Sequence, residues 1–248
     1  MKRQVVLTVS ESKRLIAKAV AGMEVVQKAK KDGILVISGG TTNSDLAEEI
    51  LGHPIDKRAF RHGITVPAVN PERGGGGDPQ GTPDLVLRKG QVDSTVNRIT
   101  VVPEMGRGDV FIKGTNALDY KNKVAGILIA NPSGGSVGGA WGHIYGTHLH
   151  LIIPVGLEKL VYEDIYALAR RTMDPDYVGP TLYPVTGTIV TEIEALRLLT
   201  GVEASLLAAG GVAGAEGAVR LLLEGTAQQV EQALTLVGQI QGEPRWVL

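Results

Sequence analysis

Four short stretches of this chain are almost wholly apolar, and none of them alternates regularly with polar residues. They lie at 34–37, 110–112, 126–130 and 149–155. A strand with one face in water alternates apolar and polar residues, whereas a parallel strand covered by helices on both faces does not. Helical spacing of apolar residues follows Ser10, our predicted N-cap. The sequence therefore predicts an α/β fold with a mostly parallel, Rossmann-like sheet flanked by helices.

The last quarter of the chain has a different order of elements. We predict strands and helices in the order βαββαβ, at 188–191, 192–199, 203–208, 218–223, 227–240 and 245–248. This order is typical of a ferredoxin-like domain. Pro180 and Pro184 interrupt regular structure just before it. We therefore expect two domains, an α/β domain at 1–183 and a ferredoxin-like α+β domain at 184–248.

The remaining segments are assigned from shorter patterns. We expect further strands at 4–9, 64–69, 85–87 and 97–102, and helices at 45–51 and 163–171. The glycine-rich stretch at 70–83 is predicted as a surface loop, either a loose linker or a lid over a ligand.

The composition excludes several classes of function. The chain has 25 Lys+Arg and 26 Asp+Glu, a formal net charge of −1, so no excess of positive charge favours nucleic acid or a membrane surface. It has no cysteine, which excludes disulfides and cysteine-ligated metals. No apolar stretch of about 18 residues is present, and the N-terminal apolar run is too short for a signal peptide. We expect a cytoplasmic protein with no nucleic-acid or membrane partner.

The first candidate site follows the apolar run at 34–37. Glycines, hydroxyls and an amide occupy the next positions, before a predicted helix: Ser38, Gly39, Gly40, Thr41, Thr42, Asn43 and Ser44. Unpaired N–H groups at a helix start favour an anion, and glycines let it approach the backbone. The pattern predicts a phosphate or carboxylate site; alternatively, the hydroxyls only cap the helix. Neither a Walker motif nor GxGxxG occurs here, and no cofactor is predicted.

Two later segments offer groups to the same edge of the sheet, since ligands gather outside the carboxyl ends of parallel strands. After the run at 110–112, Lys113 can pair with an anion, and Asp119 is either a base or the cap of a turn. The candidate ligand-binding residues of these segments are Lys113, Gly114, Asn116, Ser133, Gly134, Gly135 and Ser136. The glycines at 134–135 allow a second anion cradle or a tight crossing of backbones.

Three histidines lie within eight residues. His148 and His150 would share one strand face and one metal ion, but no carboxylate is close in sequence, so a hydrogen-bonded structural role is favoured and no metal is predicted. His143 titrates near neutrality when unperturbed. We predict Asp119 and His143 as the acid/base pair, if the protein is a catalyst.

Three motifs in this order resemble the superfamily of ribose-5-phosphate isomerases, DeoR-type sensor domains and CoA-transferases. They are GILVISGGTTNSDLAEEILG at 33–52, DVFIKGTNALD at 109–119 and LIIPVGLEKLV at 151–161. The resemblance implies that Gly39, Gly40, Thr41 and Thr42 hold a substrate phosphate. It also places Gly114, Asn116 and Asp119 in a turn typical of that superfamily, and Lys159 at a ligand-binding position.

The sequence departs from those isomerases where their general base should lie. No Lys, Asp or Glu occurs between Ala130 and Leu157. We therefore expect binding of a small anionic, sugar-phosphate-like metabolite at the strand ends, with an isomerase or hydrolase activity left open. The alternative is a non-catalytic ligand sensor or assembly subunit, and we expect a homo-oligomer in either case.

Overall fold

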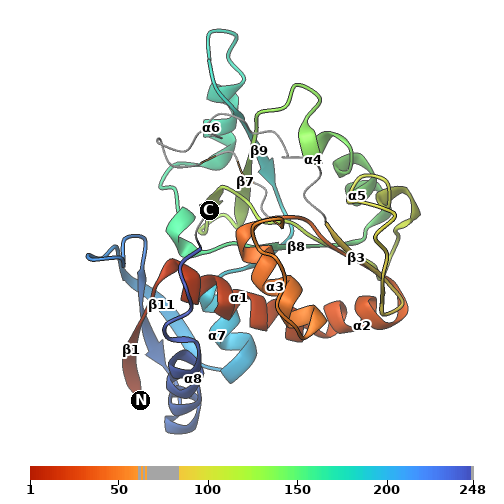
Figure 1. Ribbon diagram of the computed structural model, residues 1–248. Helices are drawn as coiled ribbons and strands as arrows, with labels where there is room; N and C mark the ends of the chain where they lie inside the picture. The colour runs from red at the N-terminus through yellow and green to blue at the C-terminus, as the bar shows by residue number, and fades with distance from the viewer. Residues whose placement is uncertain (61–62, 64, 66–83, 247–248) are drawn as a thin grey trace.

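The computed structural model describes residues 1–60, 63, 65 and 84–246. Apart from residue 65, the predicted strand at 64–69 and the glycine-rich loop at 70–83 lie outside the described residues. Three sheets and the helices packed on them form the described part of the chain (Figure 1). None of its helices is long and apolar enough to cross a membrane.

A six-stranded sheet forms the centre of the molecule. Its strand order is β10-β8-β5-β2-β3-β4. The first four strands are parallel, and the last two are antiparallel to their neighbours. The strands are β2 (Ile34–Ile37), β3 (Leu85–Arg88), β4 (Gln91–Val92), β5 (Val110–Ile112), β8 (His150–Pro154) and β10 (Thr188–Val190). The predicted α/β class with a mostly parallel sheet is confirmed.

Three helices from the first part of the chain lie along this sheet (Figure 1). They are α1 (Val9–Gly22), α2 (Glu24–Asp32) and α3 (Thr41–Leu51). α1 begins two residues earlier than predicted, because Thr8 rather than Ser10 is its N-cap. The Thr8 hydroxyl accepts from the Glu11 N–H, and the Glu11 carboxylate accepts from the Thr8 N–H at 2.8 Å. The apolar face of α1 is fully buried at Leu15 and Ile16.

Replacing Thr8 with alanine should therefore destabilise the fold. Loss of an N-cap hydroxyl costs about 1 kcal/mol, because one backbone donor of the first turn loses its acceptor. At roughly 2–4 °C per kcal/mol for a chain of this length, the melting temperature should fall by a few degrees. Thr235→Ala, on the exposed face of the last helix, is the matched control and should leave the melting temperature nearly unchanged. Equal effects of both substitutions would contradict the capping role.

A second, antiparallel sheet lies against the carboxyl edge of the first. Its order is β6-β7-β9, with β6 (Ala117–Asp119), β7 (Val124–Ile129) and β9 (Thr181–Val185). Helix α6 (Ile165–Thr172) packs on it, and an isolated bridge joins Leu118 to Leu160 after β8. The segment of β9 was expected to be an irregular linker because of Pro184. As β9 is the outer strand of this sheet, the missing N–H of Pro184 is tolerated there.

The third sheet joins the two ends of the described chain. β1 (Lys2–Leu7) pairs antiparallel with β12 (Val219–Glu224), and β12 pairs with β11 (Glu203–Ala209). Helices α7 (Glu192–Thr200) and α8 (Ala227–Ile240) pack beside it. This differs from the predicted βαββαβ unit. The strand at 188–190 pairs with β8 in the large sheet, and β1 forms an edge of the third sheet in its place. Residues 245–246 form no strand, and 247–248 lie outside the described residues. The division after residue 183 stays a prediction.

The strand expected at 97–102 is mostly turns, and the glycine-rich loop expected at 131–139 is partly helical. Residues 97–102 form turns leading into the short 3-10 helix η1 (Val102–Glu104). The glycine-rich stretch after Ala130 contains α4 (Gly135–Gly138) and α5 (Trp141–Thr147). Trp141 is buried and meets Phe111 of β5 edge to face, with ring centroids 6.2 Å apart. This contact explains why so glycine-rich a segment is helical, because α5 buries a large aromatic ring against the sheet.

Candidate functional site

The turns that follow the parallel strands are joined to one another by backbone hydrogen bonds. The Ser38 N–H donates to Ile112 O at 3.0 Å, and the Lys113 N–H donates to Ile152 O at 3.1 Å. Val155, after β8, donates to Val190 O at 3.0 Å. In each case a carbonyl of one strand accepts from the N–H of the first residue after the neighbouring strand. The turns after β2, β5, β8 and β10 therefore lie along one edge of the sheet. Ligands of parallel sheets bind at such an edge.

The first turn of α3 lies at this edge, and its residues Thr42, Asn43 and Ser44 are buried. The helix begins at Thr41, four residues earlier than expected, so Thr42 to Ser44 belong to its first turn rather than to a loop. Gly40 is the N-cap and no side chain caps the helix. The Ser44 hydroxyl donates to Thr41 O at 2.7 Å. In the described part of the chain, the N–H groups of Thr41, Thr42 and Asn43 have no acceptor, so the capping alternative is not what the structure shows.

Asn43 connects this turn to the neighbouring strand. Its amide donates to Ser38 O at 2.6 Å, and its buried Oδ1 has no partner among the described residues. The glycines before the helix are also tied, since Gly39 N–H donates to Asp84 Oδ1 at 3.0 Å and Gly40 N–H to Phe60 O at 2.9 Å. The turn is therefore fixed before any ligand binds.

Four cationic side chains surround this edge. Lys113 is only 8% exposed, and its Nζ donates to Gly114 O at 3.2 Å. Lys159 Nζ donates to Thr115 O at 2.8 Å, and Arg98 pairs with Asp84 at 2.8 Å. Burial, and then the positive charges of Arg98 and Lys159, lower the pKa of Lys113 to about 8, although Asp84 opposes the shift. The fourth cation, Lys13 of α1, has its pKa lowered by burial and by Lys159.

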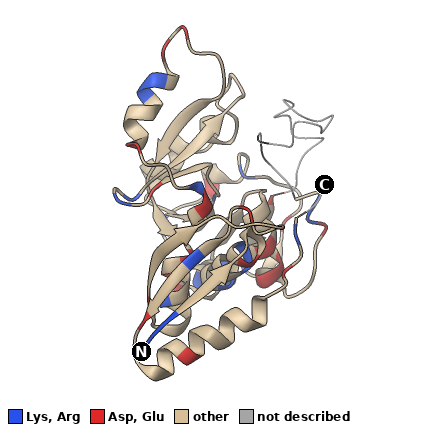
Figure 2. Ribbon diagram, turned by 90° about the vertical axis from the view of Figure 1, so that its left-hand side faces the viewer, with Lys and Arg blue, Asp and Glu red and all other residues tan. Residues whose placement is uncertain are grey.

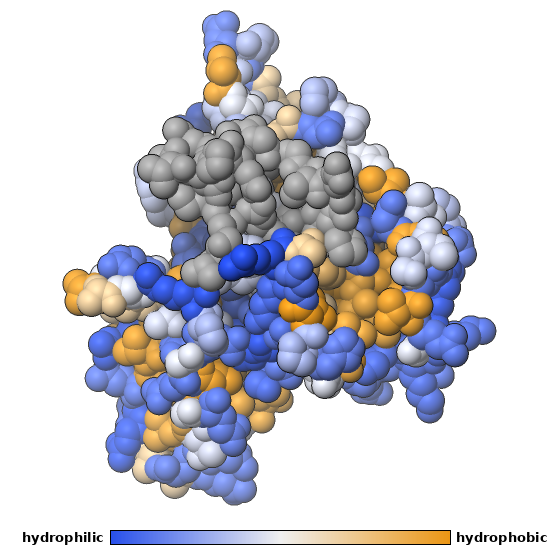
Figure 3. Space-filling model, in the orientation of Figure 1, coloured by the Kyte–Doolittle hydropathy of each residue, from blue (hydrophilic) through white to orange (hydrophobic). Residues whose placement is uncertain are grey.

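A cavity of about 300 Å³ opens beside Lys13. It is lined by Ser10, Lys13, Asp45, Ile55, Asp56, Lys57, Arg58, Glu243, Pro244, Arg245 and Trp246. Figure 3 shows strongly hydrophilic side chains on this face near the top of α3. The sequence did not single out Lys13, Arg98 or Asp84, because each comes from a segment without a local binding motif.

The neighbouring ion-pair network contains more carboxylates than cations. Arg14 contacts the carboxylates of Asp45, Glu48, Glu49 and Glu243, and Lys57 contacts three of the same groups. Figure 2 shows acidic and basic residues interleaved in this part of the molecule. By contrast, no carboxylate of the described residues forms an ion pair with Lys13, Lys113 or Lys159. Within the described part of the chain, these three lysines can therefore meet an anionic ligand without first breaking an ion pair.

A buried carboxylate completes the edge at the start of α7. Glu192 is fully buried, and its Oε2 accepts from the Leu157 N–H at 2.9 Å, which holds the turn carrying Glu158 and Lys159. Its Oε1 has no partner among the described residues. Burial, and then the nearby charge of Glu158, raise the pKa of Glu192 to about 7. The sequence did not reveal this residue as a candidate.

Several predicted site residues have local structural partners instead. The Asp119 carboxylate accepts from the Asn122 N–H at 3.0 Å and from its side-chain amide at 2.7 Å, the turn-capping alternative. His143 Nε2 lies 2.9 Å from Met105 O. Asn116 Oδ1 accepts from Leu128 N–H at 3.0 Å, at the start of the second sheet. No hydrogen bond between described residues joins Asp119 to His143, and their catalytic pairing stays a prediction.

The stretch predicted as a second anion cradle is a closed turn. The Asn131 side chain accepts from the Ser133 N–H at 2.9 Å and from its hydroxyl at 2.7 Å. Gly134 has φ +83°, and a Cβ at Gly138 would lie 2.1 Å from Ser133 O, so glycine is required at both positions. Ser136 is buried in the short helix that follows Gly134, and Gly135 begins it. These contacts account for the glycines through close backbone packing.

The histidine pair has no further metal ligand around it in the part of the chain that is described. His148 is in the left-handed region at the end of α5, with φ 56°, and His150 is exposed at the start of β8. Among the described residues, no group of three or more His, Asp or Glu side chains is placed to hold a metal ion.

Comparison with known proteins gave no relative: no protein-family model matches this chain, and neither a curated protein nor a solved structure matches it.

Proposed function

We propose that this protein binds a small phosphorylated or carboxylated metabolite, of the sugar-phosphate kind, at the carboxyl edge of the six-stranded sheet. One observation carries the proposal. Lys13 and Lys113 each lie close enough to Lys159 for its charge to lower their pKa, and none of the three lysines forms an ion pair with a described carboxylate, although Asp84 acts on Lys113 and Glu158 and Asp45 act on Lys13 without pairing. The positive charges of these lysines repel one another, which lowers the stability of the folded protein. A bound anion would offset this repulsion and so stabilise the fold.

The geometry favours an anion with several oxygens. The N–H groups of the first turn of α3 point along the helix axis, and the positive end of the helix dipole adds to the lysines. Thr41 and Thr42 add hydroxyl donors next to these N–H groups. The cavity of about 300 Å³ beside Lys13 is at the lower end of the range for small-molecule sites, about 300–1,000 Å³, and of the three lysines only Lys13 lines it.

The test is thermal unfolding with ribose 5-phosphate, with unphosphorylated ribose as the matched compound. A ligand at about 100 times its dissociation constant adds about 2.7 kcal/mol to stability. The melting temperature should then rise by at least about 5 °C with ribose 5-phosphate and stay unchanged with ribose. Lys159→Met should weaken binding about tenfold or more, because it removes a charged donor.

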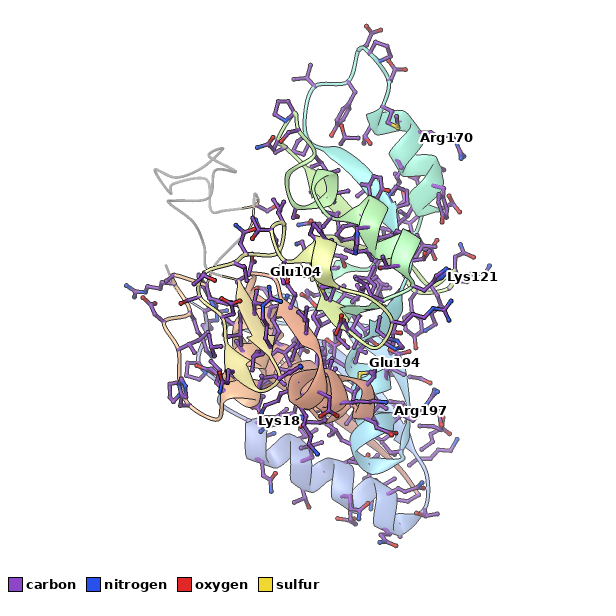
Figure 4. All side chains as sticks on the ribbon, turned by 90° about the vertical axis from the view of Figure 1, so that its right-hand side faces the viewer. Lys18, Glu104, Lys121, Arg170, Glu194 and Arg197 are labelled. Carbon is purple, nitrogen blue, oxygen red and sulfur yellow. The ribbon has the colours of Figure 1, made fainter. Side chains whose placement is uncertain are left out.

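Lys121→Met is the control for this variant, since Lys121 is an exposed lysine in the turn between β6 and β7 and points outward (Figure 4). It should bind the phosphate like the native protein. A panel of sugar phosphates and small carboxylates that leaves the melting temperature unmoved would overturn the proposal.

The proposed site also bears on the family resemblance. The phosphate loop of the isomerase/CoA-transferase-like superfamily would correspond to Gly39, Gly40, Thr41 and Thr42, which end β2 and begin α3 here. We propose that the α/β unit is a Rossmann-like member of this superfamily. This part of the proposal rests on the sequence motifs alone and on the position of these residues at the strand end.

A further inference from the structure

We propose that Lys113 forms a covalent imine with a small aldehyde or ketone that also carries the phosphate or carboxylate group. This inference rests on the proposed function and names its substrate class. Lys113 follows the last residue of β5, and its backbone is fixed by the hydrogen bond to Ile152 O. Its amine donates to Gly114 O and that of Lys159 to the next carbonyl, Thr115 O, so the two amines lie close together in the turn after β5.

The surroundings of Lys113 favour a neutral amine. The only described acceptor of its Nζ is the carbonyl of Gly114, and no described carboxylate pairs with it. Arg98 and Lys159 are held close by their own partners, Asp84 and Thr115 O, and remain positively charged. Lysines that are desolvated or placed beside another cation become nucleophiles in this way. With its pKa lowered to about 8, roughly a tenth of this amine is neutral at pH 7.

The roles of the lysines then separate. Lys159 and the first turn of α3 hold the anionic group, and Lys113 attacks the carbonyl carbon. The new N–C bond forms as the carbonyl π bond opens, and a proton moves from nitrogen to oxygen to give a carbinolamine. Its C–O bond then breaks and water leaves, with one proton taken from solvent, which gives the protonated imine. No oxidant or reductant is needed for this step.

Chemical trapping tests this inference on the full chain. The protein is incubated with glyceraldehyde 3-phosphate and sodium cyanoborohydride, which reduces an imine to a stable secondary amine. Intact-mass and peptide analysis should find one rapid adduct per chain, at Lys113. Its rate should rise with pH through about 8, whereas exposed lysines such as Lys121 react only slowly at that pH. Glycerol 3-phosphate, which lacks the carbonyl, should protect Lys113.

Two further measurements separate this inference from the proposed function. Lys113→Arg keeps a positive charge but has no amine for an imine, so it should lose the rapid adduct at position 113. Binding of glycerol 3-phosphate to the native protein without any preferred adduct would overturn the imine and leave the anion site standing. If neither phosphate compound binds and labelling spreads evenly over exposed lysines, both proposals fail. The native protein supplies these outcomes even if the substitution at position 113 prevents folding of the variant.

Discussion

Replacing Lys113 with methionine is expected to make the protein more stable and to weaken its binding of ribose 5-phosphate. The ordinary pKa of lysine is 10.5, and that of Lys113 is lowered to about 8. A difference of this size corresponds to about 3 kcal/mol, which the folded protein loses at neutral pH by burying the charged amine. Methionine has a similar length and no charge, so the melting temperature should rise by roughly 6–12 °C. Ribose 5-phosphate binding should fall at least about tenfold.

The pH dependence identifies the cause. The unfolded chain keeps this proton up to about pH 10.5 and the folded chain only up to about pH 8, so native stability from this group rises between these values. Below pH 8 Lys113 is charged in both states, so the folded protein bears the full cost of burying the charged amine. The advantage of Lys113→Met, measured by urea unfolding, should therefore be largest at pH 7 and shrink towards pH 10. Lys121→Met is the exposed control. A variant that is less stable than the native protein at pH 7 would refute this account.

Glu192→Gln should have an effect of similar size with the opposite pH dependence. The pKa of Glu192 is raised from 4.5 to about 7, so the folded chain keeps a proton that the unfolded chain has lost over this range. Native stability from this group is highest below pH 4.5 and falls as pH rises through 7, by up to about 3 kcal/mol. Glutamine is neutral throughout, and its carbonyl can still accept from the Leu157 N–H. The variant should be the more stable protein at pH 8 and equal to the native protein near pH 4.5.

Urea unfolding at pH 5 and pH 8 measures this difference. Glu231→Gln, on the exposed face of α8, should change stability little at either pH. If Glu192→Gln shifts the midpoint equally at both values, then burial does not set the protonation of Glu192. A loss of stability at both values would instead mean that a charged Glu192 is required to hold the turn at 156–159.

The sequence predicted those elements whose boundaries are encoded locally. The strand at 34–37 and the helix at 227–240 have the predicted bounds, because an apolar run before glycine and a capping threonine before an amphipathic helix are local signals. Pro184 and the glycines after Ala130 led to the wrong assignment of β9, α4 and α5. The pairing of β9 with β7 and the contact of Trp141 with Phe111 determine the secondary structure of these segments. Both are contacts between residues far apart in the sequence, so a local sequence pattern does not reveal them.

The candidate site divides in the same way. Ser38 to Ser44 and Lys113 were predicted because they directly follow apolar strands. Arg98 and Glu192 reach the edge from elements whose local patterns concern turns and caps, so their burial depends on the tertiary fold. Strand β10 makes the point clearly. Its residues predict a strand, but only the folded chain selects β8 rather than β11 as its partner.

The pairing of β1 with β12 bears on how the chain folds during synthesis. Lys2 is paired with Glu224 and Leu7 with Val219, so β1 cannot complete this pairing until β12 has been made. Contacts of such sequence separation form late, because a long loop must close before they return any free energy. While the ribosome is still adding the central sheet, β1 is an unpaired edge next to the apolar face of α1. Until β12 has emerged, Val5 and Leu7, which are buried in the folded chain, lack the strand that pairs with β1, and a chaperone bound to β1 and α1 would shield them over that interval.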